Sequence, residues 1–195
     1  MIHKIPVILA SKSPRRKQLL EDAGFEVEVM IKEVDESYPI DMPVEDVAEF
    51  IAEKKADAFS DLIDADHFII TADSIVVKDG KIYGKPSDKA DAIQILNILQ
   101  GSIHQVYTGV CIRKEGRMYT FTELANVTME AMTLDEIEYY LDLCQPYDKA
   151  GAYGIQDWIG LCKVSKIEGT MSNIMGLPIY KIYQIIQNWQ NIISK

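Results

Sequence analysis

Residues 5–24, IPVILASKSPRRKQLLEDAG, set the architecture to be expected of this chain. The apolar run at 5–10 is bounded by polar residues and is typical of a short buried strand. Ser13 can cap a helix, and Pro14 is favoured at the first helical position. The helix is expected to stop at Gly24, because glycine readily adopts the left-handed conformation that closes a helix. A strand therefore leads directly into a helix.

The same two kinds of signal alternate along the rest of the chain. Further strands are expected at 25–31, 67–77, 81–84, 103–114, 117–130 and 158–168, and helices at 44–62, from a Ser87 cap to Gly101, at 133–143 and at 178–193. The turn signals Asp79-Gly80 and Glu115-Gly116 argue against a purely parallel sheet. We therefore predict an α/β fold with a mixed twisted sheet flanked by helices. No linker or repeat interrupts the sequence, so we expect a single domain over residues 1–195.

The composition limits the partners of the protein. The net charge is −10, from 30 acidic and 20 basic residues, so the chain would repel nucleic acid unless its few cations gather in one place. No apolar run approaches the roughly 20 residues that span a bilayer. The N-terminal MIHKIPVILA has too short an apolar stretch for a signal peptide. We expect a cytoplasmic protein that binds neither nucleic acid nor membrane.

Cations do gather at the start of the first helix, in Ser11-Lys12-Ser13-Pro14-Arg15-Arg16. A helix N-terminus has free N–H groups and a partial positive charge, and the Arg guanidinium forms paired hydrogen bonds with phosphate oxygens. The structural alternative is a well-capped helix with a solvated basic first turn. Cations in the first turn oppose the helix dipole, however, which favours an anion-binding site.

Lys55 lies in the middle of the apolar stripe of the helix expected at 44–62, in line with Ile51 and Phe59. A lysine on a buried face must extend to the surface or find an anionic partner. The partner would be a carboxylate in a structural salt bridge or a bound phosphate.

Asp73 lies at the centre of an apolar strand, IITADSIVV (69–77). An ionised carboxylate in such a strand needs cations, hydrogen bonds or a metal around it. The loop VDES (34–37) carries Asp35 and Glu36, and one of them could hold Mg²⁺ together with Asp73 against substrate phosphates. Spacing alone does not choose between Asp35 and Glu36.

Two glycine-containing segments are weaker signals. GKP (84–86) resembles the end of a phosphate loop but lacks the Walker spacing. DKAGAYGIQ (148–156) ends in Gln156, whose amide offers a donor and an acceptor side by side and so suits the edge of a base. A simple glycine-rich connection would explain this segment as well.

Taken together, these segments resemble the Maf family of nucleotide pyrophosphatases. The matching pieces, in family order, are ILASKSPRRKQLL (8–20), VDES (34–37), AEKKA (52–56), TADSIVV (71–77), GKP (84–86), GSIHQVYTGV (101–110), DKAGAYGIQ (148–156) and NIMGLP (173–178). Each piece is weak alone, but eight in register over nearly the whole chain are very specific.

The resemblance implies hydrolysis of nucleoside triphosphates to the monophosphate and pyrophosphate, with Mg²⁺ or Mn²⁺ as cofactor. It also implies a fold similar to inosine triphosphate pyrophosphatases, with two lobes and a central cleft, and frequent homodimers. The AYGIQ form of the last glycine-containing segment resembles the branch that cleaves dTTP and UTP.

The resemblance also assigns roles to individual residues. Asp73 matches the family's catalytic acid/base, and Glu36 matches its other essential carboxylate, which would hold the metal with Asp73. The positions tied to substrate choice are Arg15, Ser74 and Gln156. The phosphate-contacting positions are Ser11, Arg16, Lys55 and Lys85, with Ser13 in the same loop as the first two.

The sequence departs from the family pattern after Gln156, where Asp157-Trp158 stands in place of the more usual small residues. This departure concerns the base preference and not the reaction. Two other functions are open at this point: a pyrophosphatase selecting ITP or XTP, and a non-hydrolysing nucleotide-binding regulator of cell division.

Overall fold

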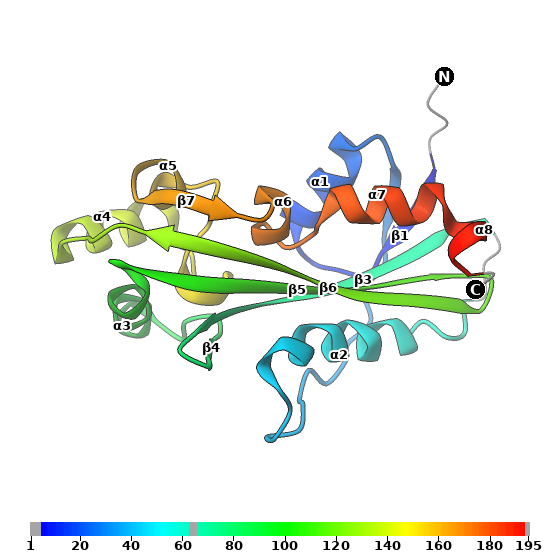
Figure 1. The fold of residues 1–195 in the computed structure, drawn as a ribbon, viewed down its shortest axis with the longest axis horizontal. Helices are drawn as coiled ribbons and strands as arrows, with labels where there is room; N and C mark the ends of the chain where they lie inside the picture. The colour runs from blue at the N-terminus through cyan, green and yellow to red at the C-terminus, as the bar shows by residue number, and fades with distance from the viewer. Residues whose placement is uncertain (1–4, 63–65, 194–195) are drawn as a thin grey trace. The chain divides into compact units, whose positions relative to one another are not determined.

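The computed structural model describes residues 5–62 and 66–193. The elements along the chain are β1 (Pro6–Leu9), α1 (Pro14–Asp22), β2 (Glu26–Val29), α2 (Val44–Asp57), β3 (Phe68–Lys78), β4 (Lys81–Tyr83), α3 (Lys89–Leu99), β5 (Ser102–Lys114), β6 (Arg117–Met129), α4 (Leu134–Cys144), the 3₁₀ turn η1 (Ala150–Ala152), α5 (Trp158–Cys162), β7 (Val164–Glu168), α6 (Met171–Ile174), α7 (Ile179–Gln187) and α8 (Trp189–Ile192) (Figure 1). Part of the N-terminal stretch on which the signal-peptide expectation rests lies outside the described residues.

The strands form one seven-stranded sheet in the order β2-β1-β3-β5-β6-β7, with β4 paired to β3. β1 pairs in parallel with both β2 and β3, whereas β4 and β7 pair antiparallel with β3 and β6. The prediction of a mixed sheet in an α/β fold is confirmed. No helix in the described part of the chain has the length and apolar character of a membrane span.

Four of the predicted elements were wrong in detail. The helix predicted at 44–62 ends at Asp57, and the helix predicted at 178–193 is divided at Asn188 into α7 and α8. The cap of α3 is Asp88, whose side chain accepts from the Asp91 N–H at 2.8 Å, and Ser87 instead donates to the Asp91 carboxylate. The strand predicted over 158–168 begins with α5, and only Val164–Glu168 is extended. Gly160 lies so close to the Ile155 carbonyl that a side chain there would collide with it, which shows how tightly this helical turn folds back on the preceding loop.

The described chain divides into two compact units, described separately below. The first comprises Met1–Asp73, Thr108–Glu123 and Gly176–Lys195, and the second Ser74–Tyr107 and Leu124–Met175. Strands β3, β5 and β6 contribute residues to both units. The single domain and the cleft between two lobes stay predictions.

The first unit has core residues on both faces of its sheet. Successive side chains of a strand point to opposite faces, so neighbouring residues belong to different clusters. Val7 and Leu9 of β1 pack in one cluster with Leu20 of α1 and Ile182 of α7. Ile8, between them, packs on the opposite face with Phe59, just after α2. In Figure 1, α1 and α7 accordingly cover one side of the strands of this unit and α2 the other.

Helix α2 is held tightly against the sheet of the first unit. A Cβ at Gly109 of β5 would overlap the backbone of Ala48 and Glu49, so only glycine permits this close approach. Thr71 of β3 donates to the Ala52 carbonyl at 2.6 Å, which fixes the middle of the helix. These contacts determine where the next turn of α2, with Lys55, lies over the sheet.

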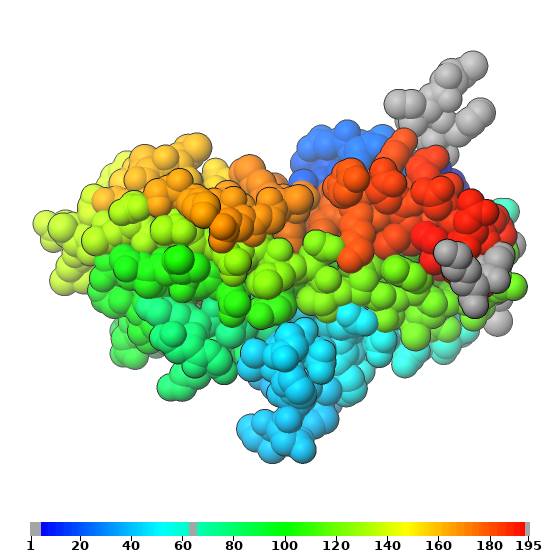
Figure 2. All heavy atoms as spheres, viewed as in Figure 1, coloured from blue at the N-terminus to red at the C-terminus, as the bar shows by residue number. Residues whose placement is uncertain are grey.

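The loop that leads into α2 is an exposed part of the first unit. Ile40 in this loop is fully exposed. In the space-filling view the segment, blue to cyan, projects from its surroundings as a ridge (Figure 2).

The second unit has one main core, formed by α3, α4 and the strands beside them. Its buried residues include Leu96 of α3, Val127 of β6 and Leu141 of α4. The turn η1 packs on this core through Gly151, which has a φ of +71° and lies against Val76. The Gly151 N–H also donates to the carbonyl of Gly84 at 3.0 Å, which joins the segment 148–156 to the GKP segment.

Candidate functional site

The start of α1 is built as the sequence predicts. Ser13 is the N-cap, and its hydroxyl accepts from the Arg16 N–H at 3.4 Å, with Pro14 at the first helical position. The Ser11 hydroxyl accepts from the Ser13 N–H at 3.2 Å and from Nη1 of Arg16 at 3.4 Å. The loop from Ser11 to Arg16 therefore forms a compact polar turn at the end of β1, and Arg15 lies half-buried within it.

Arg16 links this turn to two other segments of the first unit. Its Nη1 donates to the Ala72 carbonyl at 2.8 Å, and its Nε donates to the Gly176 carbonyl at 2.7 Å. Burial lowers the pKa of Arg16, and the nearby Asp73 carboxylate opposes this shift. The guanidinium thus fixes the backbone immediately before Asp73, a role that the sequence did not indicate.

Lys55 lies between two carboxylates. Its Nζ is 2.8 Å from Oε1 of Glu36 and 2.8 Å from Oδ1 of Asp73. The Lys55 side chain is 15% exposed and that of Asp73 is 17% exposed, whereas the side chain of Glu36 is 55% exposed. The prediction that a lysine on the buried face of α2 needs an anionic partner is confirmed, and of the two alternatives the structure shows the carboxylate salt bridge, with Glu36 and Asp73 as partners.

The structure also separates Glu36 from its neighbour Asp35. The Asp35 carboxylate accepts from the N–H and the hydroxyl of Ser37 and lies 3.4 Å from Nζ of Lys54. The hydrogen bond from the Ser37 hydroxyl lowers the pKa of Asp35 and so keeps it ionised. The two adjacent acids thus pair with two adjacent lysines, and only Glu36 shares a cation with Asp73.

The Glu36–Asp73 pair suits a divalent cation that the substrate helps to bind. Within the described residues there is no group of three or more His, Cys, Asp or Glu side chains that would form a complete protein site. Mg²⁺, however, is commonly held by one or two carboxylates, with substrate phosphates and waters as the other ligands. Two carboxylates that both contact one ammonium group already converge on a single positive charge.

The remaining predicted residues belong to the second unit. Ser74 follows Asp73 on β3 and is half-buried, and Lys85 is exposed just after β4. Gln156 follows η1, and its Nε2 donates to Oδ1 of Asp157 at 3.1 Å. Ser74 thus lies in the middle of a strand, whereas Lys85 and Gln156 lie in connecting segments.

A hydrogen-bonded network beside Gln156 was missed by the sequence reasoning. The Tyr140 hydroxyl accepts from the Gly154 N–H at 3.0 Å and donates to Oδ2 of Asp157 at 3.3 Å. Nζ of Lys149 lies 3.9 Å from the same Oδ2 atom. Burial raises the pKa of Tyr140, so its hydroxyl remains protonated. The only signal in the sequence was the unusual acid after Gln156.

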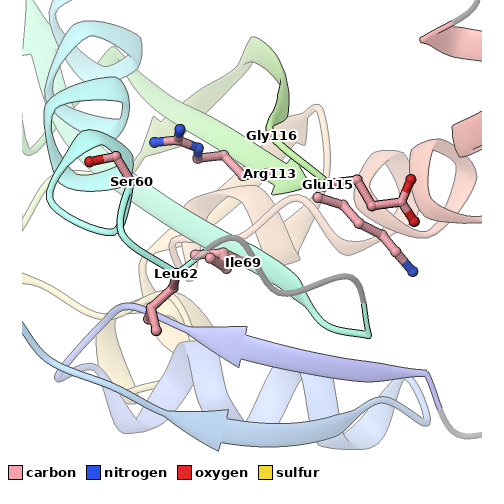
Figure 3. Close-up of a pocket in the computed structure, with 7 residues that line it drawn as sticks. Ser60, Leu62, Ile69, Arg113, Glu115 and Gly116 are labelled. Atoms are coloured by element: carbon pink, nitrogen blue, oxygen red, sulfur yellow. The ribbon is translucent and has the colours of Figure 1, made fainter.

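A hollow elsewhere in the first unit is not a candidate site. It is lined by Ser60, Leu62, Ile69, Arg113, Lys114, Glu115 and Gly116 (Figure 3). None of these lining residues is a predicted site residue. The guanidinium group of Arg113, which lines the hollow, donates to the Ala56 carbonyl at 2.8 Å and so holds α2.

Fold and site together define a class: an α/β protein in which a basic helix start and a lysine-bridged pair of carboxylates lie in one compact unit. The family is defined by comparison with known proteins. The profile described as Maf-like protein matches residues 6–189, and the chain belongs to this family.

Curated relatives match almost the full length of the chain. A dTTP/UTP pyrophosphatase of Bacteroides thetaiotaomicron is 45% identical over 183 residues, which cover 93% of this chain and 95% of that protein. A dTTP/UTP pyrophosphatase of Flavobacterium johnsoniae is 37% identical over 185 residues, 95% of each chain. Among solved structures, the Ham1 protein of Staphylococcus aureus matches with a TM-score of 0.44 and 17% identity over 64% of this chain and 71% of that one.

Proposed function

We propose that this protein hydrolyses nucleoside triphosphates, with dTTP and UTP preferred, to the nucleoside monophosphate and pyrophosphate. The observation that carries the proposal is Lys55, held between Glu36 and Asp73 with both distances at 2.8 Å. Relatives that share about two fifths of the sequence bear the name dTTP/UTP pyrophosphatase, which supports both the reaction and the base preference.

Asp73 is the proposed catalytic residue. A water molecule attacks the α-phosphorus, the bond to the bridging oxygen of the β-phosphate breaks, and pyrophosphate leaves. Asp73 orients this water through a carboxylate oxygen and accepts its proton there. Arg16 supports this role because its hydrogen bond to the Ala72 carbonyl fixes the strand next to the carboxylate.

The triphosphate is bound mainly by positive charge. The loop with Ser11, Ser13 and Arg16 supplies hydroxyl and N–H groups at a helix N-terminus, which attracts anions. Lys55 and Lys85 add ammonium groups. Lys55 offsets one of the two negative charges of Glu36 and Asp73, which weakens the repulsion of a highly charged anion beside Asp73.

Glu36 and Asp73 would hold Mg²⁺ or Mn²⁺, completed by substrate phosphates. A divalent ion bound there neutralises negative charge on the phosphates and on the leaving pyrophosphate. The two carboxylates fit this role because they converge on one cation.

Gln156, Arg15 and Ser74 are the proposed selectivity residues. The Gln156 amide presents a donor and an acceptor side by side, which matches the N3–H and a carbonyl of uracil or thymine. Purines would be limited by the size of the pocket, with Trp158 as the bulky residue. Gln156→Ala should therefore erode the preference for pyrimidines more than it lowers the best rate.

The experiment that tests the proposal is pyrophosphate release from a panel of triphosphates with Mg²⁺ and with Mn²⁺. We expect dTTP and UTP to be cleaved faster than ATP, GTP, ITP and XTP. Asp73→Asn should lower turnover by at least about 100-fold, the scale of a lost acid/base. Asp35→Asn is the matched control, because Asp35 pairs with Lys54 and Ser37 and is outside the Lys55 pair.

Three other outcomes of this experiment would change the proposal. Preference for ITP or XTP would replace the pyrimidine assignment, and binding without any release of pyrophosphate would indicate a nucleotide-binding regulator. Near-normal turnover by folded Asp73→Asn would remove Asp73 from the mechanism.

Three further parts belong to the proposal: a single domain over residues 1–195 and a cytoplasmic location, which rest on the sequence pattern, and a homodimer, which rests on the family resemblance. Light scattering of the purified chain would measure the mass of the assembly, and a mass equal to the monomer would refute the dimer. Fractionation of cells that express the chain would test its location.

A further inference from the structure

The carboxylate of Asp157 is directed toward Gln156 and not toward its own helix. Asp157 is the N-cap of α5, a position where aspartate usually accepts from N–H groups of the first turn. Among the described residues, α5 has no such side-chain cap bond. The carboxylate accepts from Nε2 of Gln156 at 3.1 Å instead.

This contact fixes the orientation of the Gln156 amide, with its nitrogen toward Asp157. An ionised carboxylate can only accept hydrogen bonds, so it must face the amide nitrogen and would repel the amide oxygen. The amide therefore presents its other edge, with Oε1 as an acceptor next to the remaining N–H donor.

The carboxylate is itself held in place. The Tyr140 hydroxyl accepts from the Gly154 N–H at 3.0 Å, so its proton is available for Oδ2 of Asp157 at 3.3 Å. A Cβ at Gly154 would lie against Oδ2 of Asp157 and 2.8 Å from Nε2 of Gln156. The lack of a side chain at Gly154 therefore leaves room for both side chains, and the Tyr140 hydroxyl holds the Asp157 carboxylate.

We infer that Asp157 is a positioning residue that locks the Gln156 amide in the orientation that selects uracil and thymine against cytosine. The inference rests on the proposed role of Gln156 at the base. Uracil and thymine have a donor at N3, which Oε1 accepts, and a carbonyl beside it, which Nε2 can reach as donor. Cytosine has an acceptor at N3 and an amino group beside it, so it requires the opposite orientation of the amide.

The substitution Asp157→Asn tests the lock with almost no change in shape. The Tyr140 proton would attract the new amide oxygen, which leaves the Asn nitrogen facing Gln156. Gln156 would then turn its oxygen toward residue 157 and its nitrogen toward the base, as cytosine requires. Asp157→Glu keeps the carboxylate and is the rescue variant.

The measurement is kcat/KM for UTP and CTP with wild type and both variants, with thermal unfolding as a check on folding. In Asp157→Asn we expect kcat/KM for UTP to fall and that for CTP to rise, so that their ratio drops by about tenfold or more, the scale of a misplaced hydrogen bond to a charged group. Asp157→Glu should keep most of the wild-type ratio.

A merely structural role of Asp157 would lower both rates together and leave their ratio unchanged, and that result would overturn the inference. It would also be overturned if Asp157→Glu lost the ratio as completely as Asp157→Asn. Failure of the proposed function is separate, because it would already appear in the wild type as a lack of UTP cleavage. If Asp157→Asn does not fold, Asp157→Ala and Asp157→Glu apply the test: Asp157→Ala removes the contact that orients the Gln156 amide and should lower the ratio while Asp157→Glu does not, and an unchanged ratio in Asp157→Ala would overturn the inference.

Discussion

Replacing Lys55 by methionine separates a functional lysine from one that the fold merely tolerates. Methionine keeps an apolar stem close in length to that of lysine and removes the ammonium group with its charge and its hydrogen bonds. The variant leaves Glu36 and Asp73 without the cation that lies 2.8 Å from each of them. Because Lys55 lies in line with apolar residues of α2, methionine also fits the helix face.

The size of the effect follows from the two ion pairs. At 2.8 Å and an effective dielectric constant of about 20, Coulomb's law gives about 6 kcal/mol of gross attraction for each pair. Water screens the Glu36 pair, whose carboxylate is 55% exposed, so Asp73 provides most of the effect. Losing one partner of a fully buried pair costs about 3–5 kcal/mol. In Lys55→Met the partly exposed carboxylates can bind water in place of the ammonium group, so we expect the free energy of unfolding to fall by a smaller amount, about 2–3 kcal/mol.

The assay combines urea unfolding with ligand binding. Lys55→Met should lower the unfolding midpoint and weaken binding of the triphosphate and of pyrophosphate more than binding of the free nucleoside. Lys54→Met is the matched control, since Lys54 is adjacent in sequence but pairs with the exposed Asp35. Exposed ion pairs contribute little, so this variant should behave as wild type.

One combination of results would refute the reasoning. If Lys55→Met were more stable than wild type and fully active, the gain from apolar burial would exceed the loss of both ion pairs. Lys55 would then be a tolerated core lysine without a role in binding phosphate.

Two other substitutions test the packing of α2 on the sheet and the burial of His104. Gly109→Ala should shift α2 and lower both stability and turnover, because its Cβ would overlap the backbone of Ala48; unchanged urea unfolding would show that the helix can move at no cost. Burial, with a smaller effect of Lys78, lowers the pKa of His104 from 6.5 to about 4, so the folded protein keeps His104 neutral while the unfolded chain binds a proton. The free energy of unfolding should therefore fall by about 3 kcal/mol as the pH drops from about 6.5 to about 4. His104→Phe should lose correspondingly less stability across that range. An equal dependence of stability on pH in both proteins would contradict the lowered pKa of His104.

Much of the fold could be predicted because local signals and tertiary structure agree. The helix predicted at 133–143 is present as α4, and Thr133 and Glu136 form a capping box at its start. The segment from residue 158 was assigned wrongly because a short apolar run fits a strand and a helical turn equally well. There the outcome depends on a tertiary contact, the approach of Gly160 to the Ile155 carbonyl, which no local pattern encodes.

The candidate site could be predicted only where a residue contradicts its surroundings. Lys55 on an apolar stripe and Asp73 in an apolar strand are two such residues, and each turns out to be the partner of the other. Asp157 differed only from the family pattern and not from its surroundings, because an acid in a polar loop is ordinary until its neighbours in space are known.

The choice between Asp35 and Glu36 depends on the tertiary structure. Successive residues of a helix point about 100° apart, so Lys54 and Lys55 face different directions from α2. Successive residues of an extended loop also point to opposite sides, so Asp35 and Glu36 diverge as well. The helix and the loop meet in a register that pairs Lys54 with Asp35 and Lys55 with Glu36. A slip of one residue between them would bring Asp35 to Asp73 instead, so the identity of the second carboxylate is a property of this register and could not be read from spacing along the chain.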